Sequence, residues 1–314
     1  LISLIENNDR VAFVMDIEIN TAENSIGNIS FTTAKINVKK NFSYEEKLLL
    51  KCQDYKEILR ITKALQAKPN NLQKYKYVEE IRDSHDVVEY YMIMMNHMCA
   101  ERLYSHKCGI YRTVSTNTKT DADKTINQPN VDKELQKFIN IWKYTSSRYS
   151  LYDEHTGHDI VAGGIDKYAQ ITSPIRRLCD IVNMAELQIR LGKLVETESM
   201  RQTIDKITDD IDNVNVLSKN VRKVQSSCKL LNYCLDMGED NNVVEGYIID
   251  IIEKSDIAEY SIYVPSLGLI TKIKKQLQEE NSYIEYNLYE KYKFGVCVFT
   301  DEHSFHKKIR LVFR

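Results

Sequence analysis

Residues 168–180 read YAQITSPIRRLCD and carry the signals of a helix start. Ser173 is a favourable N-cap residue, and Pro174 suits the first turn of a helix. We therefore predict a short extended piece over residues 168–172, followed by a helix that begins at Ser173 and ends at Gly192. Such a first turn has free backbone N–H groups, which attract anions.

Two neighbouring arginines follow this predicted helix start. Arg176 and Arg177 would add two guanidinium groups that suit a phosphodiester, and Asp180, one turn after Arg176, is placed to hold that guanidinium. The segment thus indicates a phosphate-binding site. A plain capped helix with surface arginines is the alternative interpretation.

The composition excludes several classes of protein. Lys+Arg total 43 and Asp+Glu 45, so the net charge of −2 excludes a strongly basic nucleic-acid-binding chain, and any such surface must be local. No apolar run reaches about 18 residues, so we expect no membrane partner. Seven scattered cysteines indicate free thiols in a reducing, cytoplasmic location, with a nuclear one left open.

The pattern of residues changes once along the chain. Helical periods and two strands fill the first part, and short β-rich segments fill the end, so we expect an α+β protein with domains at 1–237 and 243–314. The segments after residue 242 predict a small β-barrel of the OB type. The predicted strands are 10–19, 29–38 (with a turn at 24–28), 243–252, 258–264, 268–273, 293–300 and 308–313; the helices are 43–66, 72–106, 133–144 and 199–235, and a loop covers 115–132.

Several blocks resemble the ribonuclease II (RNB) family of exoribonucleases, in the same order. The segment 168–180 resembles the family hallmark YxHFTSPIRRYxD. Further matches are LISL…NDRVAFVMDIEI with xSL…DRLAFSV, INVKKNFSYEE with I…SYEEA, HDVVEYYMIMMNHMCAERL with VEEFMLLAN…A, and HDIVAGGIDKYAQITSP with HYGLA…YTHFTSP. The resemblance implies the C-terminal portion of an RNB catalytic domain, with a mixed sheet and long packed helices, followed by a small RNA-binding barrel of the OB type.

The resemblance also implies an activity and roles for particular residues. Family members hydrolyse single-stranded RNA from its 3′ end and release nucleoside 5′-monophosphates. By motif match, Arg176 grips the scissile phosphate, Tyr44 lies near the last base, and Glu89 is the first acidic residue of the VEEF block. The second acidic position is Tyr90, which puts its role in doubt.

Further departures from the family pattern concern the hallmark and its metal. The family histidine before TSP is Gln170, its tyrosine after IRR is Leu178, and its His-Arg pair is Met184-Ala185. The family holds Mg²⁺ with aspartates upstream of the xSL block, so we expect Mg²⁺ as cofactor, a native protein that extends upstream of Leu1, and no metal ligand in this chain. The remaining acidic and histidine clusters favour plain surface or core roles; they are Asp205, Asp209, Asp210 and Asp212, the pair His155 and His158, and the pair His303 and His306.

Single-stranded RNA is the partner that we expect. The predicted RNA-binding residues are Tyr168, Ser173, Arg177, Asp180, Lys219, Arg222 and Lys223. A non-catalytic RNA-binding protein with a degenerate RNB domain is the main alternative to an active exoribonuclease. A third interpretation makes the C-terminal barrel the sole functional module.

Overall fold

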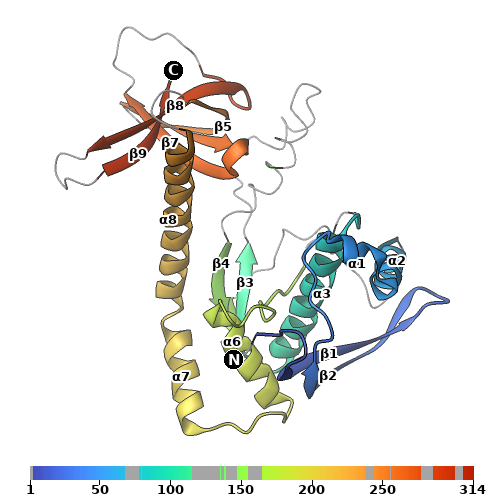
Figure 1. Cartoon of the computed structure of the whole chain (residues 1–314). Helices are drawn as coiled ribbons and strands as arrows, with labels where there is room; N and C mark the ends of the chain where they lie inside the picture. The colour runs from blue at the N-terminus through green and yellow to red at the C-terminus, as the bar shows by residue number, and fades with distance from the viewer. Residues whose placement is uncertain are drawn as a thin grey trace. The chain divides into compact units, whose positions relative to one another are not determined.

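A computed structural model provides the structure of the chain (Figure 1). It describes residues 3–67, 78, 80–114, 135, 138, 147–154, 165–237, 243–254, 256–276, 286–300 and 307–314. The chain forms two compact units: residues 1–117 with 143–212, and residues 118–142 with 213–314. The loop predicted at 115–132, most of the helix predicted at 133–144 and all four histidines of the two pairs lie outside the described residues.

The first unit begins with the long antiparallel hairpin of β1 (Asp9–Asn20) and β2 (Ser25–Asn37). The turn lies at residues 21–24 rather than at 24–28. The side chain of Asn20 accepts hydrogen bonds from the N–H groups of Ala22 and Glu23, and Asn24 adopts a φ of 51°. Asparagine tolerates this left-handed conformation, so the two asparagines place the turn.

The helix predicted over residues 43–66 is divided in two. Cys52 is extended (φ −67°, ψ 128°) and separates α1 (Lys47–Lys51) from α2 (Gln53–Ala67). The backbone N–H of Ser43 donates to the Glu46 carboxylate at 3.0 Å, which is one half of the predicted capping box. The helical backbone itself begins only after Glu46.

Helix α3 (Ser84–Ser105) is the central helix of the first unit. Its N-cap is Asp83, whose carboxylate accepts from the N–H groups of His85 and Asp86. The helix predicted from residue 72 therefore begins at 84 in the described part. Tyr90, Met94 and Leu103 are almost completely buried, and α3 packs against hairpin and loop residues through them.

Two short strands and two helices complete the first unit. Strand β3 (Ile110–Val114) pairs with β4 (Ser147–Leu151), which is followed by the short η1 (Tyr152–Glu154). Helix α6 (Leu178–Arg190) ends before Gly192, whose φ of 67° terminates the helix as predicted. The long helix predicted at 199–235 is broken at Asp210 (φ −99°, ψ 20°) into α7 (Glu198–Asp209) and α8 (Ile211–Met237).

The second unit is a nearly closed, five-stranded antiparallel barrel with α8 packed against it. The strand order is β7-β6-β5-β8-β9, and the edge strands β7 and β9 approach each other. Leu230 of α8 joins the barrel core, which includes Ile248, Ile262 and Phe294. The strands confirm the predicted β-rich segments; they are β5 (Val243–Lys254), β6 (Ile257–Val264), β7 (Leu269–Gln276), β8 (Lys291–Thr300) and β9 (Lys307–Phe313), with η2 (Pro265–Leu267) before β7.

Helices and sheets occur together, in agreement with the predicted α+β class. All strand pairs in the described part of the RNB region are antiparallel, so these residues do not form the mixed sheet that was expected. The division by compactness assigns α8 to the second unit, and the domain boundaries at 237 and 243 remain a prediction. Among the described residues, no helix combines the length and apolarity needed to cross a bilayer.

Candidate active site

The TSPIRR segment forms a separate turn before α6. The carbonyl of Ser173 accepts hydrogen bonds from the N–H groups of Arg176 and Arg177, both at 3.2 Å. Arg177 is extended (φ −128°, ψ 120°) and is the backbone N-cap of a helix that begins at Leu178. The prediction of Ser173 as N-cap was therefore wrong, because the extended Arg177 interrupts the helical backbone.

Asp180 organises this turn from inside the protein. Its carboxylate is fully buried, and Oδ2 accepts from the backbone N–H of Ser173 at 2.8 Å and from Nε of Arg177 at 3.1 Å. Asp180 therefore holds Arg177, whereas the sequence predicted that it holds Arg176. Arg176 is exposed, and its Nη2 lies 3.5 Å from Oγ of Ser173. Of the two arginines, Arg176 presents its guanidinium at the surface.

Burial determines the ionisation chemistry beside the turn. Desolvation raises the pKa of Asp180, although the Ser173 N–H and the Arg177 guanidinium favour its charged form. Burial, with a smaller contribution from Asp180, raises the pKa of Cys179 to about 12. The Cys179 thiol therefore stays protonated at neutral pH, which argues against a nucleophilic role.

Two buried asparagines hold the backbone that leads into the turn. Asn96 of α3 donates to the hydroxyl of Tyr168 and accepts from the N–H of Ile171, both at 2.9 Å. Asn183 of α6 contacts both Ile110 and Gln170 through its amide. Neither asparagine was identified from the sequence. The available signal was a polar residue within an apolar helical run, as for Asn96 after YYMIMM.

The strands β3 and β4 support the same segment from another side. The carbonyl of Tyr168 accepts from the N–H of Arg112 at 2.7 Å, and the Tyr149 hydroxyl donates to the side chain of Gln170 at 2.8 Å. The guanidinium of Arg112 lies 4.9 Å from the centre of the Tyr149 ring, a cation–π contact. Gln170, which replaces the family histidine, thus has a defined partner.

Tyr168 and Asp180 belong to the interior, although the sequence placed both among the RNA-binding residues. Tyr168 is 6% exposed and Asp180 is completely buried. Any effect of these two side chains on RNA binding would therefore be indirect, through neighbouring residues such as Ser173 and Arg177. Ser173, Arg176 and Arg177 form the part of the predicted set that lies at or near the surface of the turn.

Tyr44 and Glu89 lie at the same end of α3. The exposed ring of Tyr44 stacks on His85, with 3.7 Å between ring centres and 17° between ring planes. His85 and Glu89 are four residues apart on α3 and therefore share a helix face. The next residue, Tyr90, is completely buried, so the second family acid is replaced by a core side chain.

Two further contacts define this end of α3. The Glu45 carboxylate accepts from the N–H and the hydroxyl of Ser84, at 2.8 and 2.6 Å, and ties the Tyr44 loop to the helix. The Glu89 side chain is exposed. Neighbouring atoms nevertheless desolvate its carboxyl group, and this desolvation, with a smaller contribution from the charge of Asp86, raises its pKa. A raised pKa brings a carboxyl group closer to the range useful for proton transfer.

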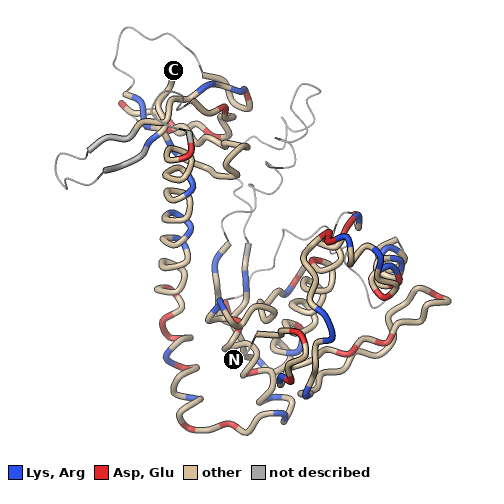
Figure 2. The backbone as a smooth tube through the Cα atoms, viewed as in Figure 1, with Lys and Arg blue, Asp and Glu red and all other residues tan. Residues whose placement is uncertain are grey.

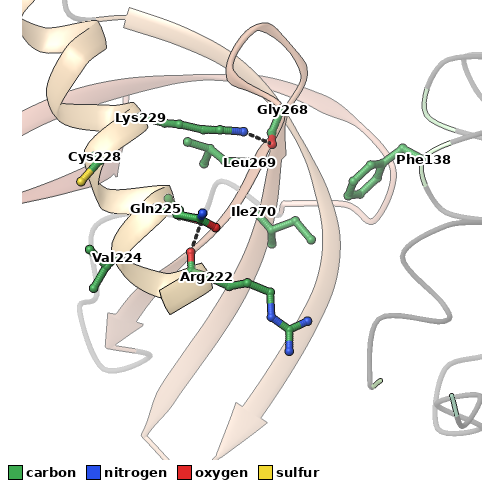
Figure 3. Close-up of a pocket in the computed structure, with 10 residues that line it drawn as sticks. Phe138, Arg222, Val224, Gln225, Cys228, Lys229, Gly268, Leu269 and Ile270 are labelled. Carbon is green, nitrogen blue, oxygen red and sulfur yellow. Dashed lines mark hydrogen bonds between the residues drawn. The ribbon is translucent and has the colours of Figure 1, made fainter. Parts of the chain in front are cut away.

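The second unit carries the predicted basic residues of α8. Lys219, Arg222 and Lys223 are all exposed on this helix. Figure 2 shows Lys and Arg positions in blue along α8. Of the three, Arg222 lines a cavity of about 630 Å³, where Figure 3 shows Leu269 and Ile270 between α8 and Phe138. The Phe138 ring stacks on Tyr263, and Lys229 donates to the Gly268 carbonyl at 3.2 Å.

The described residues do not offer a ligand set for a divalent metal. Among them, no group of three His, Cys, Asp or Glu side chains is close enough to hold an ion. Asp180 is occupied by Ser173 and Arg177, and Asp205 lies 3.7 Å from the Arg201 guanidinium. The residues that the structure describes therefore do not fit a magnesium cluster.

Comparison with known families assigns the chain. The family model described as RNB domain matches residues 1–193, which is more than half of the sequence. The chain belongs to the RNB family. Arg176, Tyr44 and Glu89 all lie in the matched RNB region, whereas α8 and the barrel follow it. A search of curated proteins found no match.

Proposed function

We propose that this RNB protein is a 3′→5′ exoribonuclease that hydrolyses single-stranded RNA to nucleoside 5′-monophosphates. The observation that carries the proposal is the exposed Arg176 guanidinium on the TSPIRR turn of an RNB domain. RNB proteins form a family of hydrolytic nucleases, which supports RNA as the substrate. The 3′→5′ direction of cleavage and the release of 5′-monophosphates are proposed from the resemblance of the sequence motifs.

In this mechanism, Arg176 contacts the scissile phosphate. A positioned guanidinium stabilises the negative charge that develops on a phosphate in the transition state. The exposed face of Tyr44 would stack on the terminal base, as aromatic side chains do in single-strand binding sites. Glu89 lies one helical turn from the His85 ring that supports Tyr44. These roles rest on the family motifs and on the exposure of the side chains.

RNB nucleases generally use a divalent metal, and we propose Mg²⁺ as the cofactor; a bound ion would supply Lewis-acid chemistry at the phosphate. The described residues do not form its site, so no step of the mechanism is assigned to metal ligands of this chain.

The partly open, five-stranded barrel supports an OB-type RNA-binding domain. Lys219, Arg222 and Lys223 would neutralise RNA phosphates outside the active site.

The test uses the purified native protein at its natural length, Mg²⁺, and single-stranded RNA labelled at its 5′ end or along its whole length. We expect mononucleotides and a ladder that shortens from the 3′ end, both abolished by EDTA. Arg176→Ala should lower kcat by about 100- to 1,000-fold, with a change in RNA affinity below about threefold. Arg60→Ala, another exposed arginine, is the control. Equal losses in binding and rate would contradict the role of Arg176.

A non-catalytic RNA-binding function is the second candidate. It is favoured by Tyr90, a completely buried side chain at the position of the second family acid. This function predicts RNA binding that EDTA does not change and no release of nucleotides with Mg²⁺ or Mn²⁺. EDTA-sensitive release of mononucleotides would exclude it.

A further inference from the structure

We infer that Asn96 and Asn183 are positioning residues, which fix the backbone of residues 168–171 and thereby the position of Arg176. This inference rests on the proposed nuclease function. Both side chains are completely buried, and each belongs to a different helix of the first unit. Neither residue touches the exposed surface of the turn, so any effect on the reaction must act through the backbone.

Asn96 uses both ends of its amide. Its Nδ2 donates to the Tyr168 hydroxyl, and its Oδ1 accepts from the N–H of Ile171. The two partners flank the segment that enters the turn. A buried backbone N–H without an acceptor is costly, so Asn96 makes this path of the chain the favourable one.

Asn183 makes three hydrogen bonds. Its Oδ1 accepts from the N–H of Ile110 at 2.7 Å, and its Nδ2 donates to the carbonyls of Ile110 at 2.8 Å and of Gln170 at 2.9 Å. The amide therefore serves as a strand partner for the first residue of β3. Through the same group it joins β3 to the segment before the turn.

The two amides restrict the backbone that connects the buried segment to Arg176. Ile171 is held by Asn96, Gln170 by Asn183, and the N–H of Ser173 by Asp180. Along the chain, only Thr172 separates Ile171 from Ser173. Since a displacement of about 1 Å at a catalytic group can cost about 100-fold in rate, loss of either asparagine should act on turnover.

The two sites differ in their response to aspartate. In Asn96→Asp, the carboxyl still accepts from Ile171, and the Tyr168 hydroxyl can rotate to donate or to accept. In Asn183→Asp, the situation is different, because the carbonyl oxygens of Ile110 and Gln170 can only accept and each needs a donor. A neutral carboxylic acid has one O–H, so one carbonyl would lose its partner.

The experiment uses the native protein at its natural length and a single-stranded RNA. It measures kcat, KM, RNA affinity and the unfolding midpoint. We expect Asn96→Leu and Asn183→Asp to lower kcat by about 10- to 100-fold with KM changed by less than about threefold. Asn96→Asp should keep kcat within about threefold of the wild type. Ile204→Ala, a buried residue of α7 outside this network, is the stability-matched control and should keep kcat.

The outcomes separate the two proposals. If Asn96→Leu does not fold, Tyr168→Phe tests one of the two Asn96 bonds, because it removes the hydroxyl and keeps the bond to Ile171. It should lower kcat with KM nearly unchanged. Loss of activity in Arg176→Ala, together with unchanged kcat in Asn96→Leu and Asn183→Asp, would overturn the positioning role alone. Losses no greater than that of Ile204→Ala at equal stability would overturn it as well. A wild-type protein without nuclease activity would overturn both proposals.

Discussion

Nε of Arg177 lies 3.0 Å from Oδ1 of Asp180, whose carboxylate is completely buried. The preceding residue, Arg176, is exposed. Two adjacent arginines with the same chemistry therefore have different environments. Arg177 is half-buried and is held by the Asp180 carboxylate, whereas Arg176 remains available to an anionic substrate.

This difference predicts unequal effects on stability. Arg177→Ala should lower the free energy of unfolding by about 3–5 kcal/mol, because it leaves the Asp180 carboxylate buried without its partner. Arg176→Ala should change it by less than about 0.5 kcal/mol, as is usual for an exposed side chain. Urea denaturation of the two variants and the wild type measures both values. Equal destabilisation by the two variants would show that the buried pair is not formed.

The contact of Glu45 with Ser84 predicts a dependence of stability on pH. The hydrogen bonds from the Ser84 hydroxyl and N–H hold the pKa of Glu45 below its ordinary value. The stabilisation is complete above the unfolded pKa of about 4.3 and is lost as the pH falls through the lower folded pKa. Glu45→Gln should therefore reduce the acid-induced fall in unfolding midpoint. Glu23→Gln, in the exposed hairpin turn, is the control and should keep the wild-type profile.

Gly246 predicts a steric limit in the barrel. A Cβ at this position would lie 2.8 Å from Cγ2 of Ile262 and 2.9 Å from the carbonyl oxygen of Tyr263. Gly246→Ala should destabilise the second unit by about 1–3 kcal/mol, as overpacking usually does. Gly27→Ala is the control, because its nearest contact would be an ordinary 3.5 Å. Thermal unfolding with equal midpoints for the two variants would contradict the close packing.

The basic face of α8 predicts a salt-dependent contribution to RNA binding. Replacing Lys219 and Lys223 with glutamine should lower the slope of log affinity against log salt by about 0.7 for each RNA phosphate that a lysine no longer neutralises. The decrease in affinity should be similar for RNAs of different sequence, because phosphates carry no base information. Lys56→Gln, on α2, is the control. An unchanged slope would exclude these lysines from the RNA interface.

The sequence alone predicted the features that depend on local pattern. The β-rich segments of the barrel, the hairpin strands and the end of α6 at Gly192 were confirmed, because alternation and special backbone conformations are properties of neighbouring residues. The ordered motifs also indicated the RNB family. Within the site, the motif indicated Arg176, which is exposed, and its catalytic role remains a prediction.

The tertiary structure decided what depends on distant partners. Asn183 and Ile110 are 73 residues apart, and Asn96 and Ile171 are 75 apart, so no local pattern indicates their hydrogen bonds. The breaks at Cys52 and Asp210, the N-cap at Arg177 and the pairing of Asp180 with Arg177 were likewise missed. Local propensity favoured continuous helices and did not distinguish the two adjacent arginines. Burial of one carboxylate, which only folding creates, selected Arg177 as its partner and left Arg176 at the surface.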